Sequence, residues 1–195
     1  MKKFLVLAIF VSILSLPLMA QDKVEVFGGY QYLHLNNVGG CGSDCPTVNA
    51  NGWDGSVTGY FNKWIGVTGD FGGAYESNVT INGVSTPISG KVYTYAGGPV
   101  LAFRKGPIHP FVHVLFGGVH LSASVSEDGE SASQSQSGFA TLVGGGADIK
   151  INRIMAVRGQ FDWVYTHFGS SPINGNVAYG ESGNVRVATG IVFRF

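Results

Sequence analysis

The chain has 195 residues, of which 30 are glycine, and its 12 basic residues balance its 12 acidic ones. The absence of net charge gives no electrostatic footprint for nucleic acid, so we expect no nucleic-acid partner. Beyond the N-terminal segment no window approaches eighteen consecutive apolar residues, which excludes spanning helices. Abundant glycine and aromatic residues with little charge are typical of a β-rich chain.

Residues 1–20 have the pattern of a secretory signal peptide. Lys2 and Lys3 precede an apolar run from Phe4 to Leu16, and Ala20 is the small residue before the expected cleavage point. An uncleaved N-terminal anchor is the alternative, and the short apolar run disfavours it. We therefore expect one mature domain at residues 21–195.

Eight segments then alternate between apolar and polar residues with the period of two that a β-strand imposes. They are expected at residues 24–35, 53–61, 64–75, 91–103, 108–121, 139–150, 154–168 and 184–195. Between them, short turns alternate with long connections at residues 36–51, 76–90, 122–137 and 169–183. The Ser/Gln/Glu-rich connection at 122–137 has no apolar content to hold it, so we expect it to be a mobile loop.

Long and short connections alternate in transmembrane β-barrels, which have short periplasmic turns and longer outer loops. In the last segment, apolar Val185, Val187 and Ile191 share one face, and Arg186 and Arg194 share the other. A membrane barrel points the apolar face to lipid and the arginines inward. The predicted fold is all-β: an eight-stranded, antiparallel, up-and-down transmembrane β-barrel. A soluble lipocalin-like barrel is disfavoured, because its strands point the apolar side inward.

The same parity places charged side chains inside the barrel. The expected network comprises Glu25, Asp70, His113, Asp148, Arg158, Asp162, Arg186 and Arg194, with Asp54 on the same face. Neighbouring strands suggest the pairs Asp148–Arg158, Asp162–Arg186 and Glu25–Arg194. Side chains can fill the interior of an eight-stranded barrel, and buried charges need partners. We interpret the network as a salt-bridged plug rather than a proton or ion path.

The chain's two cysteines, Cys41 and Cys45, lie in the first long connection. In an oxidising compartment two such residues usually pair, so we expect a disulfide that pins this loop. A metal site is the alternative, but it needs more ligands than Asp44 and the distant His34 supply. We expect no metal and no cofactor.

The strands resemble the small outer-membrane β-barrel family that includes the transmembrane domain of OmpA. The pieces that carry the resemblance are Gly98-Pro99, Pro110-Phe111-Val112-His113 with Leu115 and Gly117, Gly144-Gly145-Gly146-Ala147-Asp148, Arg158 with Gln160 and Asp162, and residues 190–195. The resemblance implies residence in the bacterial outer membrane, with outer-membrane lipid as a partner. It also implies that the barrel assembly machinery reads a signal in the last strand, comprising Ile191, Phe193 and Phe195. We expect a monomer.

Some eight-stranded outer-membrane barrels are lipid A deacylases that use a His/Ser pair near the outer rim. His167 with Ser170 or Ser171 lies near that rim, and Glu181 is placed to orient the histidine. The compact His-x-Ser-Asn arrangement is absent, however, and His167 shares the parity of the lipid-facing strand residues. We therefore expect no enzyme and no catalytic residues.

Six carboxylates and no Lys or Arg occupy the four long connections. We do not expect these loops to attract heparin-like polymers or lipid phosphates directly. The expected function is structural or surface-interactive, through the long outer loops and an unidentified extracellular ligand. A narrow porin of low conductance is the alternative.

Overall fold

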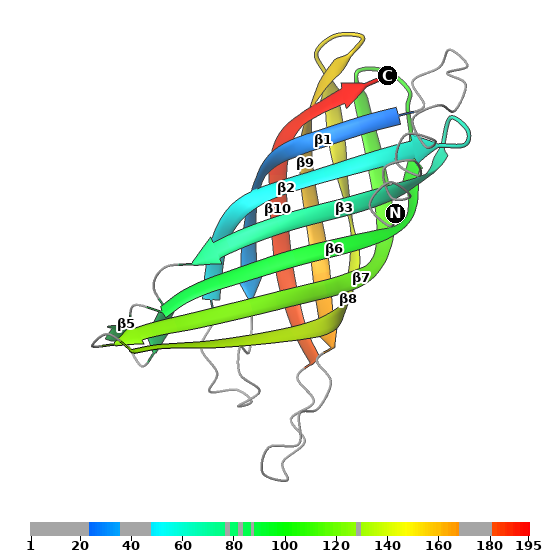
Figure 1. Ribbon diagram of the computed structural model, residues 1–195. Coiled ribbons are helices and arrows are strands. Elements are labelled where there is room, and N and C mark those ends of the chain that lie inside the picture. The colour runs from blue at the N-terminus through cyan, green and yellow to red at the C-terminus, as the bar shows by residue number, and fades with distance from the viewer. Residues whose placement is uncertain are drawn as a thin grey trace, which may run out of the picture.

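A closed β-barrel forms the body of the protein (Figure 1). The computed structural model describes residues 24–35, 48–76, 79–81, 84–86, 88–127, 130–167 and 181–195, so the expected signal peptide lies outside the described residues. The barrel strands are β1 (Val24–Leu35), β2 (Val48–Tyr60), β3 (Ile65–Glu76), β6 (Ile88–Ala102), β7 (Ile108–Glu127), β8 (Glu130–Lys150), β9 (Met155–His167) and β10 (Glu181–Arg194). Each pairs antiparallel with its neighbours, and β1 closes on β10. The predicted eight-stranded, all-β antiparallel barrel is confirmed.

Two shorter strands, β4 (Val79–Ile81) and β5 (Val84–Thr86), form a separate two-stranded sheet within the connection from β3 to β6. The described residues include no helix with the length and hydropathy that crossing a membrane requires.

Three short turns lie at the barrel end that also carries Phe195. Two of them are built alike: the side-chain oxygen of Asn62 accepts the amides of the second and third residues after it, and Asn152 does the same, all at 2.7–2.8 Å. Asparagine favours such turns because its side chain satisfies amides that the ladder leaves open. The third turn has Gly106 at φ 80°, a left-handed conformation that glycine adopts without a steric penalty.

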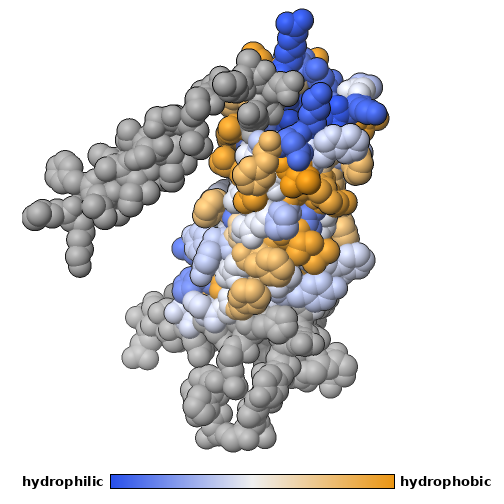
Figure 2. Space-filling view, turned by 90° about the vertical axis from the view of Figure 1, so that its right-hand side faces the viewer, coloured by the Kyte–Doolittle hydropathy of each residue, from blue (hydrophilic) through white to orange (hydrophobic). Residues whose placement is uncertain are grey.

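Side chains alternate strictly between the interior and the outer wall. Along β7 the exposed fraction is 4% at Phe111, 55% at Val112 and 6% at His113. Large apolar and aromatic side chains cover the outer wall, and Figure 2 shows them over the middle of the barrel, with hydrophilic residues gathered at the upper end. An apolar wall around a partly polar interior is the arrangement that a lipid environment stabilises.

Strands β7 and β8 extend far beyond the segments expected from the sequence. They pair continuously as far as Glu127 with Glu130, and in Figure 1 they project to the lower left of the barrel. The expectation of a loop at residues 122–137 is therefore wrong. Backbone pairing between two strands needs no apolar side chains, and Asp128-Gly129, the dipeptide between the strand ends, is among those most favoured in tight hairpins.

Candidate functional site

The interior of the barrel holds a network of ion pairs, which begins near the end with the short turns. Glu25 on β1 and Arg194 on β10 are cross-strand partners, with Arg194 Nε 2.9 Å from Glu25 Oε1. Arg158 on β9 reaches Asp148 on β8 at 2.7 Å and Glu25 at 3.2 Å. Arg194 also contacts Asp148 at 2.8 Å. These four residues are at most 5% exposed, so each charge depends on its neighbours for compensation.

Arg104 joins this cluster although its sequence position assigns it to a turn. Its Nη2 lies 2.6 Å from Glu25 Oε1, and its guanidinium carbon lies 3.7 Å from the centre of the Tyr60 ring. Arg158 stacks similarly, 4.4 Å from the Phe111 ring centre. The alternation pattern could not predict that Arg104 joins the interior network, because its side chain folds back into the barrel from beyond the end of β6.

A second cluster surrounds Arg186 on β10, whose side chain is 1% exposed. Its guanidinium makes two contacts with Asp70 on β3, at 2.7 and 3.1 Å. It also donates to Asp162 on β9 at 2.9 Å, and approaches Asp54 on β2 at 3.4 Å. One cation therefore links three carboxylates from three strands across the interior.

His113, Gly144 and Asp162 occupy one register row across β7, β8 and β9. His113 Nε2 lies 2.7 Å from Asp162 Oδ1. A Cβ atom at Gly144 would sit 2.1 Å from that same oxygen, so this position has no room for a larger residue. The glycine lets the imidazole and the carboxylate meet across the intervening strand.

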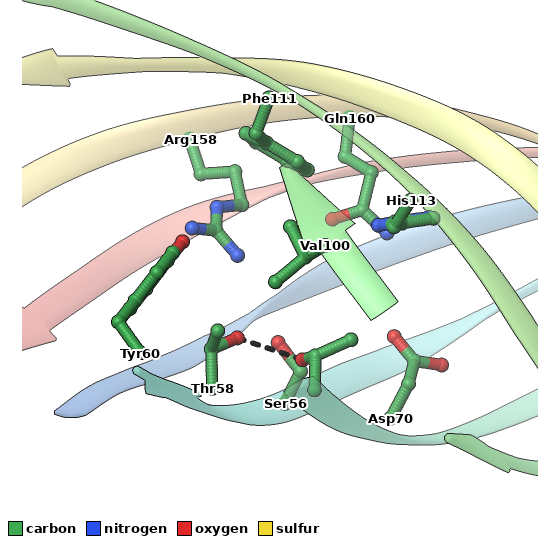
Figure 3. A pocket seen from close by; sticks show the side chains of 10 residues that line it. Ser56, Thr58, Tyr60, Asp70, Val100, Phe111, His113, Arg158 and Gln160 are labelled. Carbon is green, nitrogen blue, oxygen red and sulfur yellow. Dashed lines mark hydrogen bonds between the residues drawn. The ribbon is translucent and has the colours of Figure 1, made fainter. Parts of the chain in front are cut away.

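A small pocket lies between the two clusters (Figure 3). Its lining includes Thr58, Asp70, His113 and Arg158, and its volume is about 10 Å³. A cavity of this size has room for about one water molecule. Thr58 and Thr68 share a 2.7 Å hydrogen bond at its wall. The pocket is therefore too small to accept an organic substrate.

An apolar layer fills the interior toward the outer ends of the strands. The layer includes Leu33, Leu115, Val119, Leu142 and Val164, each at most 2% exposed. Permeating ions would have to cross this layer as well as the ion-pair clusters.

The remaining predicted site residues fall in three groups. Ile191, Phe193 and Phe195 point outward and are 39–58% exposed. Cys41 and Cys45 lie outside the described residues, so the disulfide stays a prediction. His167 ends β9, opposite Glu181 on β10, and its serine candidates lie outside the described residues.

The described residues contain no group of three or more His, Cys, Asp or Glu arranged to hold a metal ion. In the described chain, the interior charges are five carboxylates and four arginines, together with His113. These groups make ion pairs and hydrogen bonds with one another, which is the chemistry of a packed polar core.

Comparisons with known proteins agree with this architecture. The family model for the outer membrane protein beta-barrel domain matches residues 6–193. Among solved structures, Ail of Yersinia pestis is 19% identical, with 90% of this chain and 100% of that chain covered and a TM-score of 0.61. Neisserial surface protein A is 13% identical, and the alignment covers 88% of this chain and 97% of that chain with a TM-score of 0.60. OprG of Pseudomonas aeruginosa is 13% identical, and the alignment covers 89% of this chain and 96% of that chain with a TM-score of 0.56. A search of curated proteins finds no match.

Proposed function

The chain belongs to the outer membrane protein β-barrel domain family and resides in the bacterial outer membrane. From that premise we propose that it is a surface protein that neither conducts ions nor catalyses a reaction. We propose that its outer end binds an extracellular ligand. The observation that carries the proposal is the projecting hairpin of β7 and β8. Strand β8 pairs with β9 only from Phe139 onward, so residues 130–138 extend past that partner. Within the part of the chain that the structure describes, this edge of β8 has no partner strand, and such an edge is able to pair with an extended segment of another protein.

The interior supports the absence of conduction. Arg186 and its three aspartates span the barrel, and the apolar layer around Leu115 and Leu142 lies toward the outer ends of the strands. An eight-stranded barrel is filled by its own side chains, whereas porins that leave an aqueous channel have 16–18 strands. The second candidate, a narrow porin, would require the ion-pair clusters and the apolar layer to move apart and leave a continuous water path.

Strand parity supports the absence of catalysis. His167 has the same parity on β9 as Trp163 and Tyr165, which are 52% and 46% exposed on the outer wall. That position suits an interfacial aromatic belt better than a catalytic group beside a serine. We also propose that the protein is a monomer and that its last strand, with Ile191, Phe193 and Phe195, is recognised by the barrel assembly machinery.

Ail of Yersinia pestis has also been solved in complex with the heparin analogue sucrose octasulfate. We do not propose a heparin-like ligand for this protein. The four long connections expected from the sequence contain six carboxylates and no Lys or Arg, and such a charge pattern repels a polyanion.

The test is a shortened hairpin that lacks residues 122–127 and 130–135. This deletion joins Leu121 and Gln136, a cross-strand pair, through Asp128-Gly129 and so preserves the register of the barrel. We expect the free energy of unfolding to stay within about 1 kcal/mol of the wild-type value, since apart from the pairing of residues 122–125 with residues 88–91 of β6 the deleted residues pair only with one another. A much larger loss would show that the hairpin serves stability rather than binding.

Two further measurements on the full chain address the alternatives. In planar bilayers we expect no stepwise single-channel conductance, and regular conductance steps would instead support the porin. In cells that produce the protein we expect unchanged lipid A acylation, and loss of acyl chains would support the deacylase.

A further inference from the structure

Lys91, on the outer wall, has no place in the ion-pair network. Of the Lys and Arg residues that the structure describes, it alone is exposed near the outer ends of the strands. The other exposed ones, Lys63, Lys105, Lys150 and Arg153, lie in or beside the short turns at the opposite end. A lysine on the lipid-facing side of a barrel strand is costly at the middle of the bilayer, and this cost falls toward the interfaces, where the ammonium group reaches the headgroups.

The neighbours of Lys91 are polar-tipped aromatic and hydroxyl side chains. Its cross-strand partners are Tyr75 on β3 and Ser122 on β7. Lys91 lies close enough to Tyr75 for an electrostatic interaction. Two residues along β6, Tyr93 stands opposite His120, whose Nδ1 lies 2.8 Å from Ser137 Oγ.

A chain of hydrogen bonds extends this surface sideways onto β2. The Trp53 indole donates to the Tyr75 hydroxyl at 3.4 Å, and that hydroxyl donates to Tyr93 at 3.5 Å. Trp53 lies over Gly73, where a Cβ atom would be 2.8 Å from the indole nitrogen. The glycine lets the indole lie against the wall and point its polar edge toward Tyr75.

These side chains mark the height of the membrane surface. Toward the short turns, the outward residues of β3 are apolar, among them Phe71 and Val67, which are 55% and 48% exposed. Tyr and Trp place their polar ends at the headgroup level, with the apolar ring toward the acyl chains. Lys91, two residues beyond Tyr93, therefore lies among the headgroups of the outer leaflet.

We propose that Lys91, Tyr75, Tyr93, Trp53, His120 and Ser122 form a binding site for the phosphorylated headgroup of an outer-leaflet lipid. The ammonium group neutralises the phosphate, and the neighbouring hydroxyl and imidazole groups donate hydrogen bonds to it or to adjacent sugar oxygens. On β8 and β9, the described outward residues at this end include Phe139, Trp163 and Tyr165 but no exposed Lys or Arg. The site therefore lies only on the side of the barrel formed by β2, β3, β6 and β7. Glu76 follows Tyr75 on β3 and pairs with Gly90, so strand alternation turns its carboxylate to the opposite face of the wall from Lys91. The inference rests on the proposed function, which places this end of the barrel at the cell surface.

Native mass spectrometry of the full chain, released from detergent with lipid A added, tests the site. We expect lipid A adducts on the wild type, and about five-fold weaker binding for Lys91→Gln, the effect of one lysine near a charged membrane surface. Lys91→Arg should retain binding because it retains the charge. Lys150→Gln, an equal charge loss beside a short turn, is the matched control and should bind as the wild type does.

Lipid A without phosphate groups and phosphatidylcholine identify what is recognised. If dephosphorylated lipid A and phosphatidylcholine both bind more weakly than intact lipid A, the site recognises the phosphate together with the glycolipid. If dephosphorylated lipid A binds as well as intact lipid A, the proposal is overturned. Equal adducts on Lys91→Gln and the wild type also overturn it. Heat-modifiable gel mobility confirms that each variant is folded. Labelling of the Asp128→Cys variant on intact cells tests the orientation separately, so its failure would count against the proposed function itself.

Discussion

Replacing Arg186 with leucine removes the guanidinium that three interior carboxylates share. Asp162 keeps His113 and the amide of Gln160 as partners, at 2.7 and 2.9 Å. Asp70 loses a pair of contacts at 2.7 and 3.1 Å, and Asp54 loses its approach at 3.4 Å. Both aspartates are 2% exposed, so bulk solvent cannot compensate their charges.

The expected loss follows from stranding buried charge rather than from losing a favourable contact. Removing one partner of a buried ion pair costs about 3–5 kcal/mol, because the remaining charge stays desolvated. We therefore expect Arg186→Leu to lower the free energy of unfolding by about 3–5 kcal/mol. Adding Asp70→Asn removes one of the stranded charges and should recover at least about 1 kcal/mol of that loss.

Urea unfolding in lipid vesicles, followed by tryptophan fluorescence, measures these free energies. Arg153→Leu is the matched control, because Arg153 is an exposed residue of a short turn and its loss should change stability by less than about 0.5 kcal/mol. The reasoning is refuted if Arg186→Leu costs no more than this control, or if Asp70→Asn deepens the loss.

Three further changes test other parts of the structure. Gly144→Ala should lower the unfolding free energy by about 1–3 kcal/mol in the same assay, because the methyl group would overlap the Asp162 carboxylate; a neutral result would contradict the tight row. Arg104→Gln should cost about 1 kcal/mol or less, since Glu25 keeps two other arginines, and a cost equal to that of Arg186→Leu would show that Arg104 is the main partner. The two cysteines of the first long connection should react with a maleimide only after reduction, and equal labelling without reductant would rule out the disulfide.

The sequence determined the class of fold because a barrel strand has the simplest of all periodicities. In β10, Val185, Val187 and Ile191 alternate with Arg186, and this parity alone separates the lipid face from the interior. The order of long and short connections then predicts the up-and-down topology. Strand ends were less predictable: β7 and β8 continue through a Ser/Gln-rich stretch, because backbone pairing does not require apolar side chains.

Pairs between adjacent strands were also accessible from sequence, since sequential strands are neighbours in this topology. Arg158 lies beside Asp148 and Arg186 beside Asp162 for that reason alone. Contacts between side chains across the lumen could not be predicted from the sequence. Arg186 meets Asp70, 116 residues earlier, only because the barrel closes and is narrow enough for a long side chain to span it.

Lys91 shows the same division between what the sequence determined and what the tertiary structure decided. Its outward parity follows from the alternation of β6 and is readable in the sequence. The neighbours of Lys91 depend on strand register, because Tyr75 and Ser122 come beside it only when β3, β6 and β7 align. Trp53 reaches this group because Gly73 leaves room beneath the indole. The period of a strand is a local property of the chain, whereas register and closure depend on the pairing of all eight strands. The sequence by itself therefore determined which way each side chain points, and only the tertiary structure decided what it meets.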